Sequence, residues 1–187
     1  MSVPYYPISG YSRIIFYVQC IVLIVIKLIL AGTLLLFCFV IPLHVYTIGV
    51  DQGIGIQGTF YRYQVTVYGS MMITMMQDIW YVTSGTYSGR TALSIVLWVT
   101  GSISLVIATL INLIRPDYFN QHHKALTGFL LMGTGLLFII SCIAQFGLFF
   151  HGSAGISLPF GGFLLMVLGI GIMMYPSFFN LPALKKA

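Results

Sequence analysis

The sequence predicts an all-α membrane protein, in which a bundle of four transmembrane helices carries a small β-hairpin-like extracytoplasmic loop between the first and second helices. The chain has 187 residues, of which 59% are hydrophobic and only 6% are charged. Soluble domains carry about 25% charged residues, and a chain this poor in them can fold with lipid around it. We treat residues 1–187 as a single integral membrane domain, with spans at about 28–48, 92–114, 125–150 and 156–179.

The first apolar segment is longer than one span. Mostly apolar sequence runs from Ile14 to Leu43, which makes about 45 Å of helix against a hydrocarbon core of about 30 Å. Lys27 decides the placement, because an amine at the bilayer centre costs a few kcal/mol, whereas a lysine near the interface extends its amine into water. We therefore place the span at 28–48. A run this long also argues against a cleaved secretory signal.

The other three spans are each bounded by basic residues or prolines. The second ends at Arg115-Pro116, the third follows Lys124, and the fourth ends before Lys185-Lys186. All three are long enough to cross a membrane with some tilt. The third and fourth contain glycines that let helix backbones approach closely, namely Gly128, Gly133, Gly135, Gly161, Gly162, Gly169 and Gly171. Close packing of these two helices is therefore expected.

The distribution of basic residues predicts the orientation. Of the eight Lys and Arg residues, only Arg62 and Arg90 lie on the side of the outer loop, residues 49–91. The other six lie on the side of both termini: Arg13, Lys27, Arg115, Lys124, Lys185 and Lys186. Because basic residues are enriched in cytoplasmic segments, we expect both termini to be cytoplasmic and the protein to lie in the cell membrane.

The outer loop carries a strand pattern. In 60–68, polar Arg62, Gln64 and Thr66 alternate with apolar or aromatic side chains, a period of two that is typical of a strand. Gly69-Ser70 forms a plausible turn, and Met71–Thr83 is expected to return as a second strand. A two-stranded hairpin is marginal alone, so its apolar face needs the helix ends, the membrane or a partner. The expected contact residues are Met71, Met72, Ile73, Met75, Met76, Trp80 and Tyr81.

This layout of four spans, cytoplasmic termini and a β-prone first outer loop is similar to that of claudin-type tetraspan proteins. The resemblance is one of topology. The tryptophan and paired cysteines expected in that loop are not matched, because Trp80 stands there without a cysteine. No residue role is therefore carried over from that family.

Two histidines are the candidate cofactor ligands. His44 and His151 fall near the outer ends of the first and third predicted spans, and two histidines on different helices can ligate a haem or a metal. The commoner role of such histidines is to cap a helix or to meet water at the interface. No catalytic motif and no metal-ligand spacing is present, so no catalytic residue, metal or cofactor is assigned.

The functional hypothesis is a non-catalytic integral membrane subunit, or an assembly or structural protein, that packs in a larger membrane complex. A respiratory or other energy-converting complex is a natural host, in which the chain would be an accessory subunit of a membrane enzyme. Its partners would be lipid and other integral membrane proteins; nucleic acid is not expected, because no basic cluster accompanies the net charge of +5. Two alternatives are a haem- or quinone-linked redox subunit that uses His44 and His151, and a small channel or self-associating envelope or tetraspan protein.

Overall fold

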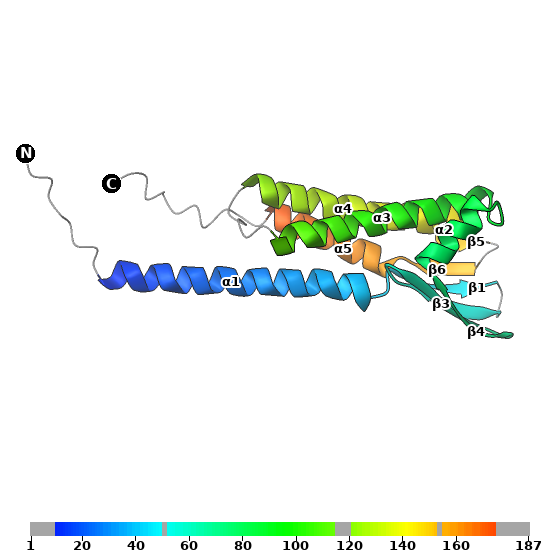
Figure 1. Ribbon diagram of the computed structural model, residues 1–187, viewed down its shortest axis with the longest axis horizontal. Coiled ribbons are helices and arrows are strands. Elements are labelled where there is room, and N and C mark those ends of the chain that lie inside the picture. Colours follow the sequence, from blue (N-terminus) through cyan, green and yellow to red (C-terminus); the bar gives the residue numbers. More distant parts are fainter. Residues whose placement is uncertain (1–9, 50–51, 115–120, 153–154, 175–187) are drawn as a thin grey trace, which may run out of the picture.

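The computed structural model describes residues 10–49, 52–114, 121–152 and 155–174 (Figure 1). Four helices lie side by side along the long axis of the molecule: α1 (Gly10–Phe39), α3 (Gly89–Ile114), α4 (Gln121–Phe146) and α5 (Phe160–Met174). A short helix, α2 (Met75–Thr83), and an antiparallel sheet lie together at the end of the molecule that α1 enters at Phe39. The first residues of α1 and the last residues of α5 lie toward the opposite end of the molecule.

The predicted all-α bundle of four transmembrane helices is wrong, because the structure combines its helices with an antiparallel sheet. Among the described residues, two helices are long and apolar enough to cross a membrane, Gly89–Ile114 and His122–Phe146. The apolar stretches described in the other two long helices, Leu28–Phe39 and Phe160–Met174, are shorter.

The error has a physical cause, since hydropathy does not distinguish an apolar strand from an apolar helix. The predicted span 28–48 contains the end of α1 and then strand β1 (His44–Ile48), and Pro42 lies between them. The predicted span 156–179 begins within strand β6 (Gly155–Leu158), and α5 starts only after Pro159. Pro42 has no amide hydrogen with which to continue the hydrogen bonds of α1, and Pro159 directly precedes the first residue of α5, where its carbonyl accepts from the Phe163 amide.

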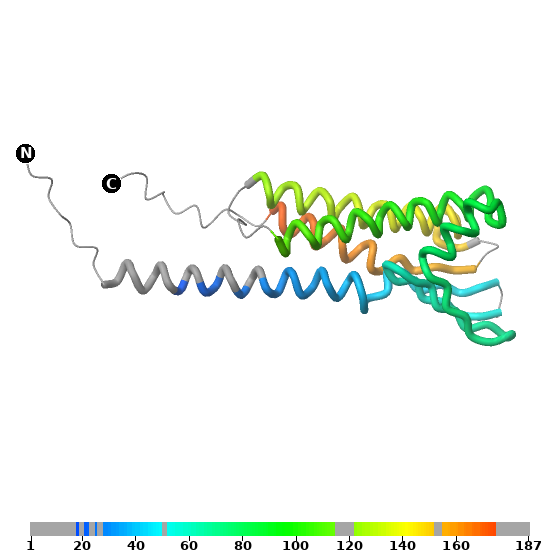
Figure 2. The backbone as a smooth tube through the Cα atoms, viewed as in Figure 1, coloured from blue at the N-terminus to red at the C-terminus, as the bar shows by residue number. Residues whose placement is uncertain are grey.

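The sheet is built from two separate parts of the chain. Its strand order is β4-β3-β2-β1-β6-β5, and all neighbouring strands are antiparallel. Strands β2 (Gly53–Gln57), β3 (Tyr61–Thr66) and β4 (Gly69–Thr74) follow β1 directly, whereas β6 and the two-residue β5 (His151–Gly152) come after α4. Figure 2 shows how the chain returns from the helices to complete the sheet beside β1.

The predicted hairpin is confirmed in its first half. Strands β3 and β4 pair, as the alternation in 60–68 indicates, but the turn between them is Val67-Tyr68, and Gly69-Ser70, which were expected to form the turn, begin β4. The second strand stops at Thr74, however, and the following residues form α2. Thr74 and Gln77 form a capping box: the Thr74 side chain accepts from the Gln77 amide, and the Gln77 side chain accepts from the Thr74 amide at 2.8 Å. This exchange starts a helix where a strand was expected.

The buried hydrophobic core lies among the four long helices, where it includes Leu34, Leu105 and Leu165, and polar contacts join it to the sheet. The sheet is joined to α3 at the β2–β3 turn. There Trp98 Nε1 donates to the Gly58 carbonyl at 3.0 Å, and Ser102 Oγ donates to the Thr59 carbonyl at 2.8 Å. The Thr59 hydroxyl in turn donates to the Phe37 carbonyl of α1 at 2.9 Å. Because Trp98 and Thr59 are buried, these bonds fix the sheet against α1 and α3.

The close approach of α4 and α5 predicted from the glycines is confirmed at two levels. A Cβ atom on Gly128 would lie 2.9 Å from the Gly169 carbonyl oxygen, and a Cβ on Gly169 would lie 2.7 Å from that of Gly128. Gly135 and Gly162 face each other in the same reciprocal way, about two helical turns away. Gly133 is different, because a Cβ there would meet no atom within 4 Å.

The predicted orientation rests partly on residues outside those that the structure describes. These are Arg115, Lys185 and Lys186, together with both chain ends. The side chains of Arg13 and Lys27 also lie outside the description. The cytoplasmic placement of the termini therefore stays a prediction.

Candidate partner-binding surface

The two faces of the sheet differ sharply in polarity. Alternation along β3 is confirmed, and the side that packs against the helices is the polar one, with Arg62 buried and Gln64 half-buried. The side that faces away from the helices carries Tyr63 and Val65, both exposed. Strand β3 is thus polar toward the molecule and apolar toward its surroundings.

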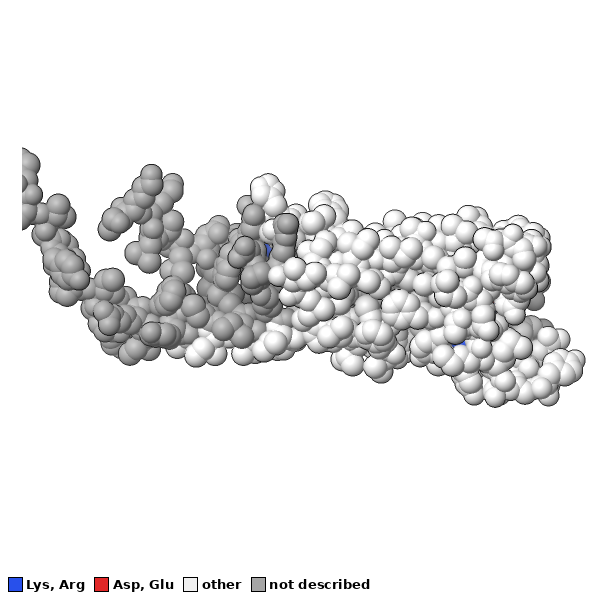
Figure 3. All heavy atoms as spheres, in the orientation of Figure 1, with Lys and Arg blue, Asp and Glu red and all other residues white. Residues whose placement is uncertain are grey.

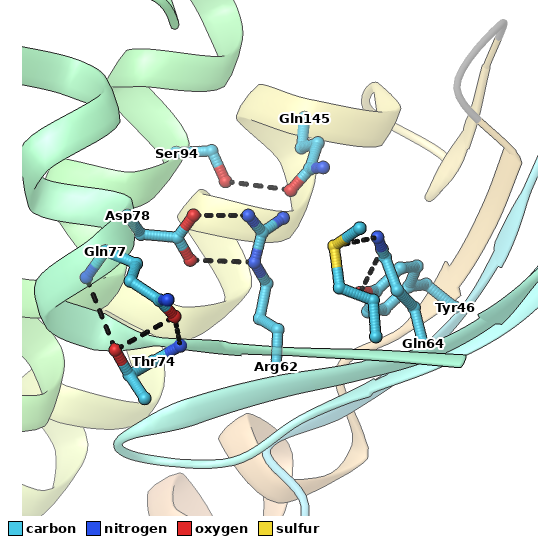
Figure 4. A network of polar contacts seen from close by, with 9 residues as sticks. Tyr46, Arg62, Gln64, Thr74, Gln77, Asp78, Ser94 and Gln145 are labelled. Atoms are coloured by element: carbon cyan, nitrogen blue, oxygen red, sulfur yellow. Dashed lines mark hydrogen bonds and ion pairs between the residues drawn. The ribbon is translucent and has the colours of Figure 1, made fainter. Parts of the chain in front are cut away.

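The inner face is anchored by a buried ion pair. Arg62 of β3 donates from Nε to Asp78 Oδ2 of α2 at 2.8 Å, and its Nη2 donates to Asp78 Oδ1 (Figure 4). Asp78 is fully buried and Arg62 is 7% exposed. Burial raises the pKa of Asp78 and the guanidinium lowers it, with burial the larger effect. The two-pronged geometry holds α2 against the sheet in one orientation.

Further polar contacts surround this pair. In Figure 4 the Arg62 side chain rises from the sheet toward Asp78, with Ser94 and Gln145 beyond it. Ser94 of α3 donates to Gln145 of α4 at 3.3 Å, and its hydroxyl also lies 3.0 Å from the Ser141 hydroxyl. The buried polar side chains thus join α3 and α4 directly behind the sheet.

His44 lies on the inner face without a hydrogen bond to its Nε2 atom. Its ring centroid is 5.4 Å from that of Tyr46 and 6.4 Å from that of Phe146, the last residue of α4. Burial, with a smaller contribution from the positive charge of Arg62, lowers the pKa of His44 to about 3. The imidazole is therefore neutral at ordinary pH, and it packs between the Tyr46 and Phe146 rings where the sheet meets α4.

The two candidate cofactor ligands do not share a site. Tyr46 lies opposite Ser157 on the buried face, and His44, two residues from Tyr46 on the same strand, points the same way. His151 lies opposite Ile156, whose side chain is exposed on the other face, and His151 is itself exposed. The described residues contain no group of three or more His, Cys, Asp or Glu placed to hold a metal ion.

The burial of His44 gives a testable pH dependence. Its pKa is about 3 in the folded protein and 6.5 in the unfolded chain, so below pH 6.5 the unfolded state binds a proton that the folded state excludes. The free energy of unfolding should then fall by about 1.4 kcal/mol per pH unit. His44→Phe removes this loss, and between pH 6.5 and 5 the variant should gain about 2 kcal/mol relative to the native protein.

The comparison is made by denaturant unfolding in detergent at several pH values. Asp78, whose raised pKa contributes with the opposite sign, is present in both proteins and cancels from the difference. Parallel stability curves for the two proteins from pH 7 to 5 would show that His44 is not the buried base described above.

The predicted contact residues divide into two groups. Met71, Met72, Met76 and Trp80 are exposed, whereas Ile73 is buried and Met75 and Tyr81 are half-buried. Ile73 lies opposite Arg62 on the inner face of the sheet, and Met75 packs against the core. The four exposed side chains lie on β4 and α2, and we call them together the β4–α2 surface; on β4, Met72 lies opposite Tyr63 on the side away from the helices and Met71 lies opposite Gln64 on the other side.

A larger apolar surface, which shares Met72 with the β4–α2 surface, was not predicted. Strand pairing places ten side chains in two rows on the side of the sheet away from the helices. We call these rows the outer face: Leu158, Val45, Ile56, Tyr63 and Met72 in one, and Ile156, Thr47, Ile54, Val65 and Ser70 in the other. No member is charged, and seven of the ten are exposed large hydrophobic or aromatic side chains.

Fold and surface together define a helical protein with two helices fit to cross a membrane and an antiparallel sheet that turns an uncharged face outward. The side shown in Figure 3 has only small areas of basic atoms and no visible acidic ones among its described residues. Comparison of the chain with protein-family models, with curated proteins and with solved structures finds no match.

Proposed function

We propose that the chain is a non-catalytic integral membrane protein that acts by packing against other membrane proteins, as a subunit or assembly factor of a larger complex. The observation that carries this proposal is the β4–α2 surface, where Met72, Met76 and Trp80 are 59%, 70% and 61% exposed. Exposed apolar patches of this kind mark sites of protein or membrane contact.

The buried ion pair prepares this surface for binding. Met72 lies on β4, and Met76 and Trp80 lie on α2. Because Arg62 of β3 and Asp78 of α2 join the sheet to the helix, the three apolar side chains are held in place before a partner arrives. Full burial of such side chains is worth about 1.5–3 kcal/mol each, which suffices to keep a subunit in place once its helices have oriented it.

The membrane setting of the proposal is argued from α3 and α4, which have the length and composition to span a bilayer. The finer placement is that of a cell-membrane protein with cytoplasmic termini, and the positions of Arg62 and Arg90 away from the other basic residues support it. A respiratory or other energy-converting complex remains the proposed host.

The test is a double substitution on the β4–α2 surface. Met72→Asp with Met76→Asp places two carboxylates where the partner should pack, and we expect at least a tenfold loss of co-purifying partners with membrane insertion unchanged. The matched control, Gln52→Asp with Ser88→Asp, adds the same charge at two exposed polar positions outside this surface and should co-purify normally. Equal recovery of the same partners with both variants would exclude the surface as the contact.

A further inference from the structure

We propose that the edge of strand β4 pairs with an extended, uncharged segment of a different membrane protein, which adds a further strand to the sheet. The pairing rests on the proposed function, because it specifies the kind of partner that the β4–α2 surface binds. Three features of the sheet support it: the direction of the backbone groups of β4, the lack of protection at its edge, and the direction of the strands relative to the helices.

Alternate residues of β4 direct their backbone groups away from β3. The Met75 amide, directly after β4, donates to the Phe60 carbonyl at 2.8 Å, and hydrogen-bonded pairs alternate with non-bonded pairs along an antiparallel ladder. The pairs that exchange bonds between β3 and β4 are therefore Arg62–Ile73, Gln64–Met71 and Thr66–Gly69. Ser70 and Met72 lie between these positions, so their amide and carbonyl groups point outward.

These outward groups meet no other strand in the part of the chain that the structure describes. Strand β4 is the last in the order β4-β3-β2-β1-β6-β5 and pairs there only with β3. Thr74 is the next outward residue, and its amide already donates to the Gln77 side chain at 2.8 Å. We call the backbone amides and carbonyls of Ser70 and Met72 the free edge. Both residues are exposed.

The free edge lacks the usual protection against an added strand. Natural edge strands are blunted by charged side chains, by proline, by bulges or by shortness. Strand β4 contains neither a charged residue nor a proline, and it pairs with β3 over six consecutive residues without a bulge. The opposite edge of the sheet is different, because β5 has only two residues. The sheet is therefore open to extension at β4.

The free edge selects a polypeptide over lipid, which apolar side chains alone do not. Acyl chains offer no hydrogen-bond donor or acceptor to backbone groups. One residue of an added antiparallel strand can exchange two hydrogen bonds with Ser70, and a second residue can do so with Met72. The side chains of Met71 and Met72, 54% and 59% exposed on the two sides of β4, would then pack against alternate side chains of that strand. An apolar residue is expected opposite Met72.

A second copy of this chain does not fit the free edge. Antiparallel pairing of β4 with its own counterpart requires a two-fold axis across the strands. In Figure 1 the strands run roughly along the long helices, so this axis would invert α3 and α4 of the second copy relative to the membrane. Copies inserted in one direction do not meet in this way. The added strand therefore belongs to a different protein.

Ser70→Pro is the decisive variant. Proline lacks the outward amide hydrogen and is tolerated on an edge strand where that hydrogen faces away from the sheet, so the bonds to β3 remain. Ser70→Ala is the matched control, because it removes the hydroxyl and keeps the amide. The probe is an acetylated and amidated peptide of alternating threonine and valine, added to the full chain in lipid nanodiscs. Its affinity should fall at least tenfold with Ser70→Pro and stay unchanged with Ser70→Ala.

Amide hydrogen exchange in the unsubstituted protein supplies a second measurement, which does not depend on the folding of a variant. Addition of the peptide should slow exchange at Ser70 and Met72 at least fivefold and leave Met71, whose amide faces β3, unchanged. Equal affinity of the peptide for the two variants, or protection only at other amides, would overturn the pairing. Capture of a differently tagged second copy that Ser70→Pro abolishes would assign the free edge to self-pairing and would overturn it as well.

Failure of the pairing can be told apart from failure of the proposed function. Recovery of partners with Ser70→Pro is compared with recovery with Met72→Asp and Met76→Asp together. If Ser70→Pro keeps every partner while the double variant releases them, the pairing is wrong and the proposed function stands. If the double variant keeps every partner while the peptide still binds through the Ser70 amide, the proposed contact is wrong and the free edge still accepts a strand.

Discussion

Removal of the Asp78 carboxylate is expected to be among the most destabilising single changes in the described part of the chain. Asp78→Ala leaves the Arg62 guanidinium buried without its partner, and loss of one member of a buried pair costs about 3–5 kcal/mol. The free energy of unfolding in detergent should fall by that amount. The double variant Arg62→Met with Asp78→Leu should be less destabilised than Asp78→Ala, because neither charge remains.

A neighbouring substitution separates this effect from damage to α2. Gln77→Ala removes one side of the capping box and should cost only about 1 kcal/mol. If Asp78→Ala proves no worse than Gln77→Ala, the ion pair does not stabilise the junction of sheet and helix.

The second large effect is expected where α4 meets α5. A Cβ on Gly135 would lie 2.7 Å from Met166 Cγ and 3.0 Å from the Met166 backbone nitrogen, with the Gly162 carbonyl oxygen closer still. Backbone atoms cannot move aside at low cost, so Gly135→Ala should lower the free energy of unfolding by about 1–3 kcal/mol through overpacking. This loss should appear although alanine favours a helix by about 1 kcal/mol over glycine.

Gly133→Ala is the control on the same helix, because its Cβ meets open space. It should leave stability unchanged or raise it by up to about 1 kcal/mol. Thermal unfolding of the two variants side by side measures the difference. Equal midpoints would mean that α4 and α5 are not in backbone contact at Gly135.

The local patterns of the sequence predicted the parts of the fold that depend on neighbouring residues. Alternation in 60–68 identified β3, whereas the turn predicted at Gly69-Ser70 lies two residues earlier, at Val67-Tyr68, and Gly69 already pairs with Thr66. The start of α2 was missed, although Thr74 and Gln77 have the spacing of a capping box. Strands β1 and β6 were missed because their apolar residues extended the hydropathy of the adjoining helices. Pro42 and Pro159 were the available signals of the change.

The candidate surface was only partly predictable, for a different reason. Exposure of Met72 and Met76 followed from an apolar segment in an otherwise polar loop. The outer face joins residues of β1, β2, β3, β4 and β6 through strand pairing, and a single sequence does not specify which strands become neighbours. The same holds for Arg62 and Asp78, which meet because β3 and α2 lie together. No sequence motif pairs an arginine with an aspartate at this spacing, so the ion pair could not be predicted from the sequence.

The pairing of β1 with β6 affects how the protein can be made. Strand β1 leaves the ribosome before α2, α3 and α4, whereas Leu158 and Ser157, which lie opposite Val45 and Tyr46, follow α4. Pairing over such a sequence separation is slow, because a long loop must close first. During translation β1 therefore presents an open edge until most of the chain has been synthesised, and strands of neighbouring nascent chains can pair with it. Any factor that shields this edge would act before the sheet is complete.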